Sequence, residues 1–305
     1  MNTMTASATA DTAARVKGPI VWLDMDQQAL DDAYDQVVYA PNRDQVAARR
    51  VANSKAARAR LGEPLRLAYG PTPIEGIDVY RSETANAPVA IFVHGGAWLH
   101  GNAAEHACLA EPFVAAGAHF AVLDFTNVTD AGGSLVPMVE QVRRAVGHLY
   151  RNAGSFGGDS KRLHLISHSS GSHLAGCVVT SDWSKDGLPL DILKGATLSS
   201  GMYDLKPVRL SKRSKYVKFT DAMEQELSAM RHLDRLHTPL VLSHGTYETP
   251  EFQRQTRDFA AAVKAAGKPV ELLVGEGYNH FEMLETLNNP YGLLGRAVFA
   301  QMGLR

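Results

Sequence analysis

Short apolar runs recur along the whole chain and predict strands. Several of them, such as "PVAIFVHGG" and "PLVLSHG", are continuously apolar instead of alternating with polar residues. A continuous pattern is typical of strands that are covered on both faces of a sheet. The eight predicted strands lie in "LRLAYG", "IDVYRS", "PVAIFVHGG", "HFAVLDF", "RLHLISHS", "GATLSSG", "PLVLSHG" and "VELLVGEG".

Helical patterns fill the gaps between these runs, notably over Leu135 to Asn152 and over Pro250 to Ala266. The second begins with proline and then Glu251, which suits the first turn of a helix and its positive end. Strands that alternate with helices predict an α/β fold with a mostly parallel sheet.

Two segments fall outside this alternation. Residues 22–61 look helical and are expected to pack over a sheet edge or a site mouth. Residues 206–219, "KPVRLSKRSKYVKF", are dense in lysine and arginine. This basic stretch is either a solvated loop or a cap that offers cations to an anionic end of a substrate. The predicted division is a flexible tail over 1–18 and one domain over 19–305. Within that domain, 19–61 is a helical extension and about 205–232 a cap insertion.

Charge and composition restrict the partners. A net charge of -1 gives no global field for nucleic acid or an anionic membrane. No stretch has the apolar core of a signal peptide or the length of a membrane span, so we expect a cytoplasmic protein. Cys108 and Cys177 match no metal or redox spacing and are expected to be reduced and buried. The expected partner is a small-molecule substrate, and a homodimer is left open beside a monomer.

The stretch "LHLISHSSGSHLAG", Leu163 to Gly176, predicts a strand, a tight turn and a helix. Such a turn exposes one nucleophile when the residues two before and two after it are small. Only Ser169 meets this condition, because Ser167 and Gly171 flank it. Ser167 departs from the G-x-S-x-G pattern. The alternative is a helix N-terminus that a serine merely caps.

An acid and then a histidine should follow such a serine, each after a strand. Glu248 follows "PLVLSHG", and His280 follows "VELLVGEG". Glu251 is a competing acid, but it falls in the first turn of the next helix. His244 is a competing base, but it precedes the acid. The predicted triad is therefore Ser169, Glu248 and His280.

The developing oxyanion needs backbone N–H donors. "FVHGGAWLHG" places Gly95 and Gly96 directly after a buried strand, as in HGGG-type loops. These two residues and Ser170 are the expected oxyanion hole, and Ala97 is an alternative to one of the glycines. The spacing of His94, His100 and His106 suggests a metal only weakly. No metal or cofactor is expected.

Six blocks together resemble the kynurenine formamidase (arylformamidase) family of α/β-hydrolases, from about Tyr69 to the C-terminus. They are "HGGAW", "PMVEQVRRAV", "SHSSGSHLAG", "SGMYDLKP", "GTYETPEFQRQT" and "NHFEMLETL". The resemblance implies an α/β-hydrolase fold in which Ser169 is the nucleophile, Glu248 the acid, His280 the base and "HGGAW" the oxyanion loop. Three positions depart from the family: Ser167 replaces a frequent glycine, and Glu248 and Asn279 each replace an aspartate of the animal members.

The activity that this resemblance implies is hydrolysis of N-formyl-L-kynurenine to L-kynurenine and formate through a formyl-enzyme. An aromatic leaving group needs a flat apolar wall, and the candidates near the expected loops are Trp98, Tyr203, Tyr247 and Phe281, each of which packing alone would also explain. A carboxylesterase acting on short-chain or aryl esters is the main alternative, since such esters are cleaved more easily than amides. A noncatalytic binding protein on a hydrolase fold is the third.

Overall fold

The computed structural model describes residues 17–305, in which eight strands form one twisted sheet in the order β10-β9-β8-β7-β5-β6-β4-β3. The strands from β10 to β6 run parallel, while β4 and β3 are antiparallel to their neighbours. The strand bounds are β3 Leu65–Ala68, β4 Gly76–Tyr80, β5 Ala87–Val93, β6 His119–Leu123, β7 Gly158–His168, β8 Leu193–Ser199, β9 Leu240–Gly245 and β10 Val270–Gly275. All eight predicted strands are present, and the predicted α/β-hydrolase architecture is confirmed.

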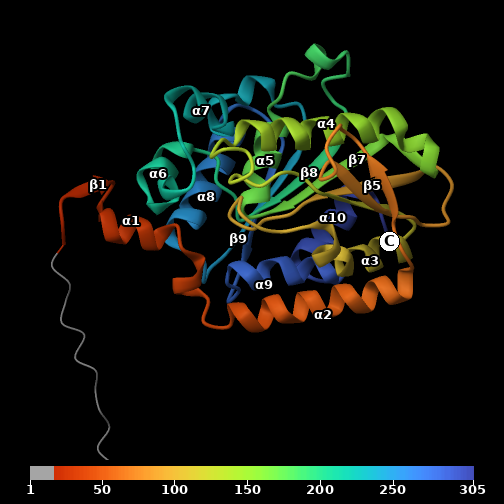
Figure 1. Cartoon of the computed structure of the whole chain (residues 1–305), viewed down its shortest axis with the longest axis horizontal. Helices are drawn as coiled ribbons and strands as arrows, with labels where there is room; N and C mark the ends of the chain where they lie inside the picture. The colour runs from red at the N-terminus through yellow and green to blue at the C-terminus, as the bar shows by residue number, and fades with distance from the viewer. Residues whose placement is uncertain (1–16) are drawn as a thin grey trace, which may run out of the picture.

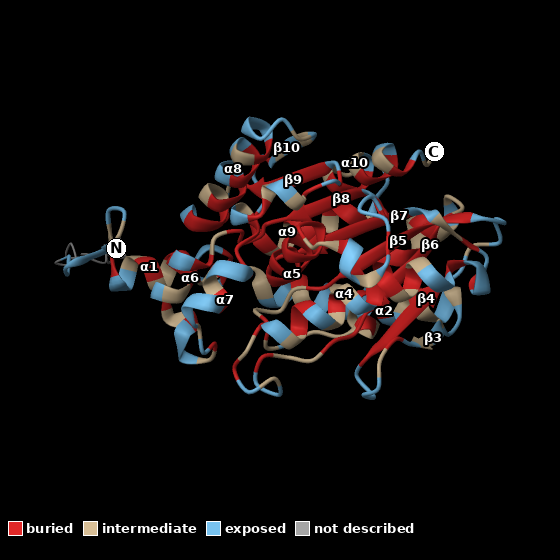
Figure 2. Ribbon diagram, turned by 90° about the horizontal axis from the view of Figure 1, so that it is seen from above, coloured by how far each residue is buried: buried red, intermediate tan, exposed pale blue. Residues whose placement is uncertain are grey.

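The continuously apolar strands are covered on both faces, as their pattern predicts. In β5, Val89, Ile91 and Val93 belong to one hydrophobic cluster, whereas Ala90 and Phe92 belong to the other. Figure 2 shows the central strands as a buried layer with exposed residues on the outer sides of the helices. Because side chains alternate between the two faces of a strand, a run that is apolar at every position serves two cores.

Helices form the two outer layers (Figure 1). Side chains of α4, α5 and α8 join the first cluster, and those of α3, α9 and α10 join the second. The predicted helices over 135–152 and 250–266 correspond to α4 and α8. The bounds are α3 Ala110–Ala115, α4 Val136–Asn152, α5 Ser170–Val179, α8 Pro250–Ala265, α9 His280–Glu285 and α10 Leu293–Met302.

The N-terminal segment is less helical than expected. Residues 22–26 belong to a two-stranded antiparallel hairpin, β1 Ile20–Trp22 and β2 Met25–Asp26, so the prediction of helix from Trp22 is wrong there. The helix starts only after Asp26, whose carboxylate accepts from the Ala29 N–H as a cap. The helical parts are α1 Gln27–Ala33, the 3₁₀ turn η1 Gln36–Tyr39 and α2 Arg43–Leu61. Residues 1–16 of the predicted tail lie outside the described residues.

The basic excursion lies between β8 and β9, beside α1 and α8 (Figure 1). It consists of short elements: α6 Leu205–Leu210, η5 Lys212–Lys215, α7 Asp221–Glu226 and η6 Ala229–Arg231. Here these residues are called the cap. The imidazole Nε2 of His173 in α5 lies 3.0 Å from the Leu227 carbonyl oxygen, which ties the cap to the core. Over residues 17–305, no helix is both long enough and apolar enough to cross a membrane.

Candidate active site

Ser169 occupies a strained turn between β7 and α5. Its backbone has φ 60° and ψ -129°, a conformation that is costly for a residue with a Cβ. Gly171 is needed for the chain to pass, because a Cβ there would lie 2.3 Å from the Val93 carbonyl oxygen. The departure at Ser167 is accommodated, since its hydroxyl lies 3.0 Å from the Ser172 hydroxyl. The turn thus holds Ser169 at the carboxyl end of the sheet, as the sequence predicts.

His280 lies within hydrogen-bond distance of Ser169. Its Nε2 is 2.8 Å from the Ser169 Oγ, and its Nδ1 is 2.9 Å from a carboxylate oxygen of Glu248. Because a carboxylate only accepts, Nδ1 carries the proton and Nε2 is free to accept one from the serine. Asn279 caps α9 in a capping box with Glu282, which fixes His280 as the first residue of that helix.

Glu248 is 1% exposed and accepts hydrogen bonds from several neutral groups. Its Oε1 accepts from the Gly245 N–H at 2.7 Å and from the Ser200 hydroxyl at 2.6 Å. The Gln36 amide donates at 3.4 Å to Oε2, the oxygen that also faces His280. Such donors stabilise a buried carboxylate without a cation. The structure therefore brings together the three predicted side chains.

Glu251, the competing acid, points elsewhere. It accepts a hydrogen bond from the Tyr34 hydroxyl at 2.9 Å and pairs with Arg254 at 2.6 Å. Burial, and then the charge of Glu251, hold the pKa of Tyr34 well above its ordinary value, so this phenol stays a donor at neutral pH. Glu251 belongs to a packing contact between α1 and α8 and does not contact His280.

The loop after β5 lines the site opposite His280. Among residues 17–305, no group accepts a hydrogen bond from the backbone N–H of Gly95, Gly96, Ala97 or Ser170. Free donors of this kind are what an oxyanion requires. Ala97 has φ 56° and Trp98 φ 65°, two left-handed residues in succession, and the Trp98 N–H donates to the Ser170 Oγ at 3.2 Å. That bond ties the loop to the turn that carries the serine.

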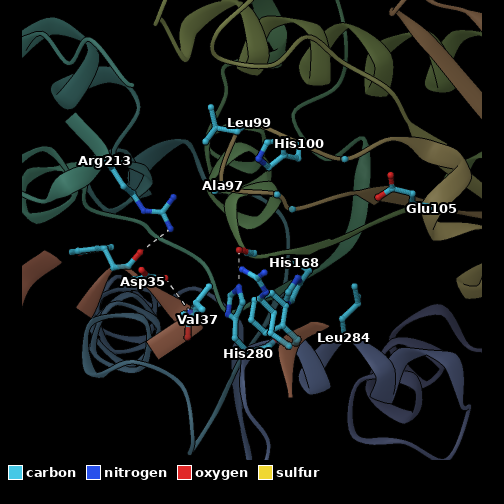
Figure 3. A pocket seen from close by; sticks show the side chains of 18 of the residues that line it. Asp35, Val37, Ala97, Leu99, His100, Glu105, His168, Arg213, His280 and Leu284 are labelled. Carbon is cyan, nitrogen blue, oxygen red and sulfur yellow. Dashed lines mark hydrogen bonds between the residues drawn. The ribbon is translucent and has the colours of Figure 1, made fainter. Parts of the chain in front are cut away.

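A cavity of about 370 Å³ opens over Ser169 and His280. It lies between the β5 loop, residues 34–37 of the N-terminal segment and the cap. Figure 3 shows Arg213 reaching in from the cap side, with Ala97 and Leu99 across from His280. The cavity is within the size range of small-molecule sites. The apolar residues along its lining are Tyr34, Val37, Ala97, Leu99, Tyr216, Phe281 and Leu284.

The predicted aromatic wall is only partly correct. Phe281 lines the cavity, but Trp98, Tyr203 and Tyr247 do not. Trp98 is buried behind the Arg213 guanidinium, which lies 5.2 Å from its ring. Tyr203 is fully buried and stacks on Phe259 at 4.2 Å. Tyr247 is 63% exposed on the outer side of its loop. Tyr216, from the basic segment that the sequence left undecided, provides aromatic surface instead.

Three functional neighbours were not expected from the sequence. Ser200 and Gln36 contact Glu248, and His168 contacts His280: the His168 Nε2 donates to the His280 carbonyl oxygen over 2.8 Å. Burial, and then the neighbouring His280, hold the pKa of His168 well below its ordinary value, so this ring is neutral. The only available signal was the position of Ser200 and His168 at the ends of apolar strands.

Two of the three histidines of the weak metal spacing lie together, since the rings of His94 and His106 stack with their centroids 5.5 Å apart. The His94 Nδ1 faces the Gly95 carbonyl oxygen at 2.8 Å, and its ring stacks on Phe125. His106 lies against the Asn102 carbonyl oxygen. Burial lowers the pKa of both rings. Within residues 17–305, no group of three or more His, Cys, Asp or Glu side chains could hold a metal ion.

Comparison with known proteins agrees with this geometry. The BD-FAE family model matches residues 77–201. A kynurenine formamidase from Danio rerio is 28% identical over 92% of this chain and 98% of its own length. A candidate thioesterase from Silicibacter sp. has a TM-score of 0.76 and 22% identity, over 88% of this chain and 97% of its own. This chain is a serine hydrolase with the α/β-hydrolase fold. The resemblance to kynurenine formamidases is confirmed. An isoprenylcysteine alpha-carbonyl methylesterase from Arabidopsis thaliana is also similar, with 25% identity over 71% of this hydrolase and 56% of its own length.

Proposed function

We propose that this hydrolase cleaves aryl formamides, with N-formyl-L-kynurenine as substrate and L-kynurenine and formate as products. In the first half-reaction the Ser169 Oγ attacks the formyl carbon while His280 Nε2 takes its proton. Glu248 orients the ring and stabilises the imidazolium. The carbonyl oxygen becomes an oxyanion, which the N–H groups of Gly95, Gly96 and Ser170 stabilise, with Ala97 as the alternative donor.

The tetrahedral intermediate collapses when the C–N bond breaks. His280 returns its proton to the leaving arylamine, which leaves a formyl ester on Ser169. A water molecule then attacks this ester as His280 Nε2 takes one of its protons. The C–O bond to Ser169 breaks, the serine recovers the proton, and formate leaves. No step requires a metal or a cofactor.

The observation that carries this proposal is the match to a kynurenine formamidase over almost both whole chains. Two features of the site support it. The cavity is modest in volume, and a formyl group, which has only hydrogen beyond its carbonyl, needs little acyl space. Phe281 and Tyr216 offer aromatic surface for the arylamine.

A carboxylesterase is the second candidate. The methylesterase relative favours it, because that protein aligns with 71% of this chain and its name describes an esterase. The same triad cleaves an ester by the same two steps, and an alkoxide leaves more readily than an amine. The two functions therefore differ in acyl size and leaving group, not in machinery.

A substrate panel separates these functions. We expect kcat/KM for N-formyl-L-kynurenine to exceed that for p-nitrophenyl butyrate, and formyl and acetyl groups to be preferred over butyryl. Ser169→Ala should lower every rate by about 10⁴-fold or more and serves as the control for background hydrolysis. A preference for butyryl over acetyl, with no turnover of the formamide, would refute the formamidase and leave the esterase.

We further propose a cytosolic location. Cys108 and Cys177 are both free and buried, and burial raises the pKa of the Cys177 thiol. Unpaired thiols are more typical of reducing compartments. Subcellular fractionation of the source cells, followed by immunoblotting with an antiserum against this protein, would test this location directly.

A further inference from the structure

Arg213 is a buried cation at the cavity over Ser169. It comes from η5 in the cap, and only 6% of its surface is exposed. Its guanidinium lies 5.2 Å from the Trp98 ring and 5.9 Å from the Phe252 ring. Figure 3 shows the side chain extending from the cap into the same space that His280 faces. The position is within the site and not on a solvated loop.

The hydrogen bonds of this guanidinium are incomplete. Nη1 donates to the Tyr216 hydroxyl at 2.9 Å and Nη2 to the Tyr34 carbonyl oxygen at 3.2 Å. The Nε of Arg213 is buried and has no partner. Over residues 17–305, no carboxylate lies within 4 Å of this cation. A guanidinium has five donors, so several of them remain for a ligand.

Other cations of the cap are either paired or exposed, which sets Arg213 apart: Lys215 and Lys218, for example, are exposed to solvent. Lys212 pairs with Asp35, and Arg209 pairs with Asp221 and Glu224. An unpaired charge is costly to bury, so a site that keeps one is expected to receive an anion in its working state. A planar guanidinium matches a carboxylate in shape and forms two parallel hydrogen bonds with it.

We propose that Arg213 is a specificity-determining residue that binds a carboxylate of the substrate. This inference rests on the proposed function and makes it more specific. Because a formyl group has no atoms to carry a charge, the carboxylate belongs to the amine part of the substrate. The enzyme is then selective for aryl formamides with an acidic side chain and discriminates against neutral ones of the same shape.

Two other arginines line the cavity but are less suited to this role. Arg50 has Glu105 at 3.9 Å, and Arg43 pairs with Asp44 at 2.6 Å. Each already has an acidic neighbour, and each is more exposed than Arg213. The variant Arg50→Met is therefore a useful comparison, since it removes a cavity cation that the proposal does not use.

The test compares matched substrates that differ only in charge. The first pair is 4-(2-formamidophenyl)-4-oxobutanoate and its terminal carboxamide. The second pair replaces the formamide by an acetoxy group and keeps the rest. The proteins are wild type, Arg213→Met, Arg213→Lys, Arg50→Met and, as a cap control outside the cavity, Arg209→Met. Thermal melts report whether each variant is folded.

We expect wild type to prefer the carboxylate by about 10- to 100-fold in kcat/KM, mainly through KM. Arg213→Met should abolish this preference, Arg213→Lys should restore part of it, and Arg209→Met and Arg50→Met should keep it. Equal rates for the two members of a pair in wild type would overturn the proposal even if Arg213→Met fails to fold. Loss of the preference in Arg50→Met instead of Arg213→Met would overturn the proposal, because the carboxylate would then bind Arg50.

The two substrate pairs also separate this proposal from the formamidase itself. Turnover of the acetoxy pair without turnover of the formamides would refute the formamidase, and the acetoxy pair would then decide the role of Arg213. Turnover of both formamides at equal rates would keep the formamidase and refute the role of Arg213.

Discussion

Glu248 and Glu251 are three residues apart, and each is 1% exposed, yet their surroundings differ in kind. Glu248 lies in the loop after β9 and is surrounded by neutral donors and by His280. Glu251 lies in the first turn of α8 and is paired with a permanent cation, Arg254. The two carboxylates are equally buried and lie in the same chain segment, so neither property distinguishes a catalytic acid from a structural one.

The partners make the distinction. A carboxylate that must respond to a histidine gaining charge is best held by neutral dipoles, which leave its own charge uncompensated and directed at the ring. A carboxylate that is already neutralised by an arginine has little left to offer an imidazolium. The comparison therefore predicts that one residue controls the rate and the other controls stability.

The largest expected effect is that of Glu248→Gln. The amide would donate to Nδ1 or leave it unpaired, which favours the wrong tautomer of His280, and we expect kcat to fall by about 10³- to 10⁴-fold. Steady-state kinetics with any turned-over substrate measure this loss. Glu251→Gln is the matched control, and a larger loss of kcat in that variant would reverse the assignment of the acid.

Glu251→Gln should act on stability instead. It leaves Arg254 with only Asp258 at 2.7 Å, and because Arg254 is partly exposed, we expect a loss of about 2–3 kcal/mol in the free energy of unfolding. Urea denaturation followed by circular dichroism measures this loss. Since Glu251 does not contact His280, kcat should stay within about threefold of wild type. A variant as stable as wild type would show that the ion pair contributes nothing.

Ser200→Ala sharpens the comparison by removing one neutral donor from Glu248. Loss of the 2.6 Å hydrogen bond should lower kcat by about 5- to 20-fold. Ser243→Ala is a suitable control, because Ser243 is a buried serine whose hydroxyl has no partner among the described residues. If both variants keep the wild-type rate, the hydrogen bond from Ser200 to Glu248 does not contribute to catalysis.

The smallest effect concerns Tyr34, the phenol that donates to Glu251. Its folded pKa is raised above 10, so the unfolded state loses this proton first and stability falls as pH rises through that range. Between pH 9 and pH 10.5, wild type should lose about 0.8 kcal/mol more than Tyr34→Phe. Urea midpoints at the two pH values test this. A loss of equal size in both proteins would mean that Tyr34 ionises normally in the fold.

Much of this arrangement could be predicted from the sequence because it depends on local order along the chain. Strands covered on both faces are continuously apolar, and a parallel sheet brings the loops after β7, β9 and β10 to one edge. Ser169, Glu248 and His280 follow those strands directly. The small residues around Ser169 excluded the other serines of the cluster, and a helical first turn argued against Glu251.

The wall of the cavity could not be predicted in the same way. Trp98, Tyr203 and Tyr247 are near the catalytic loops in sequence, but orientation decides whether a ring enters the cavity or the core. Side chains that do line it come from Val37 in the N-terminal segment and from Tyr216 and Arg213 in the cap. These segments reach the site only through long-range packing, and the hydrophobic pattern does not predict which of their residues contact it.

The most direct measurement is labelling with an active-site organophosphonate, followed by mass spectrometry of the peptide that contains residues 163–176. We predict one adduct on Ser169 in wild type, formed at a similar rate in Glu251→Gln and at a rate lower by about 10³-fold in Glu248→Gln. A folded wild-type protein that forms no adduct, or an adduct on Ser170 or Ser172, would contradict the assignment of Ser169 as the nucleophile activated by His280 and Glu248.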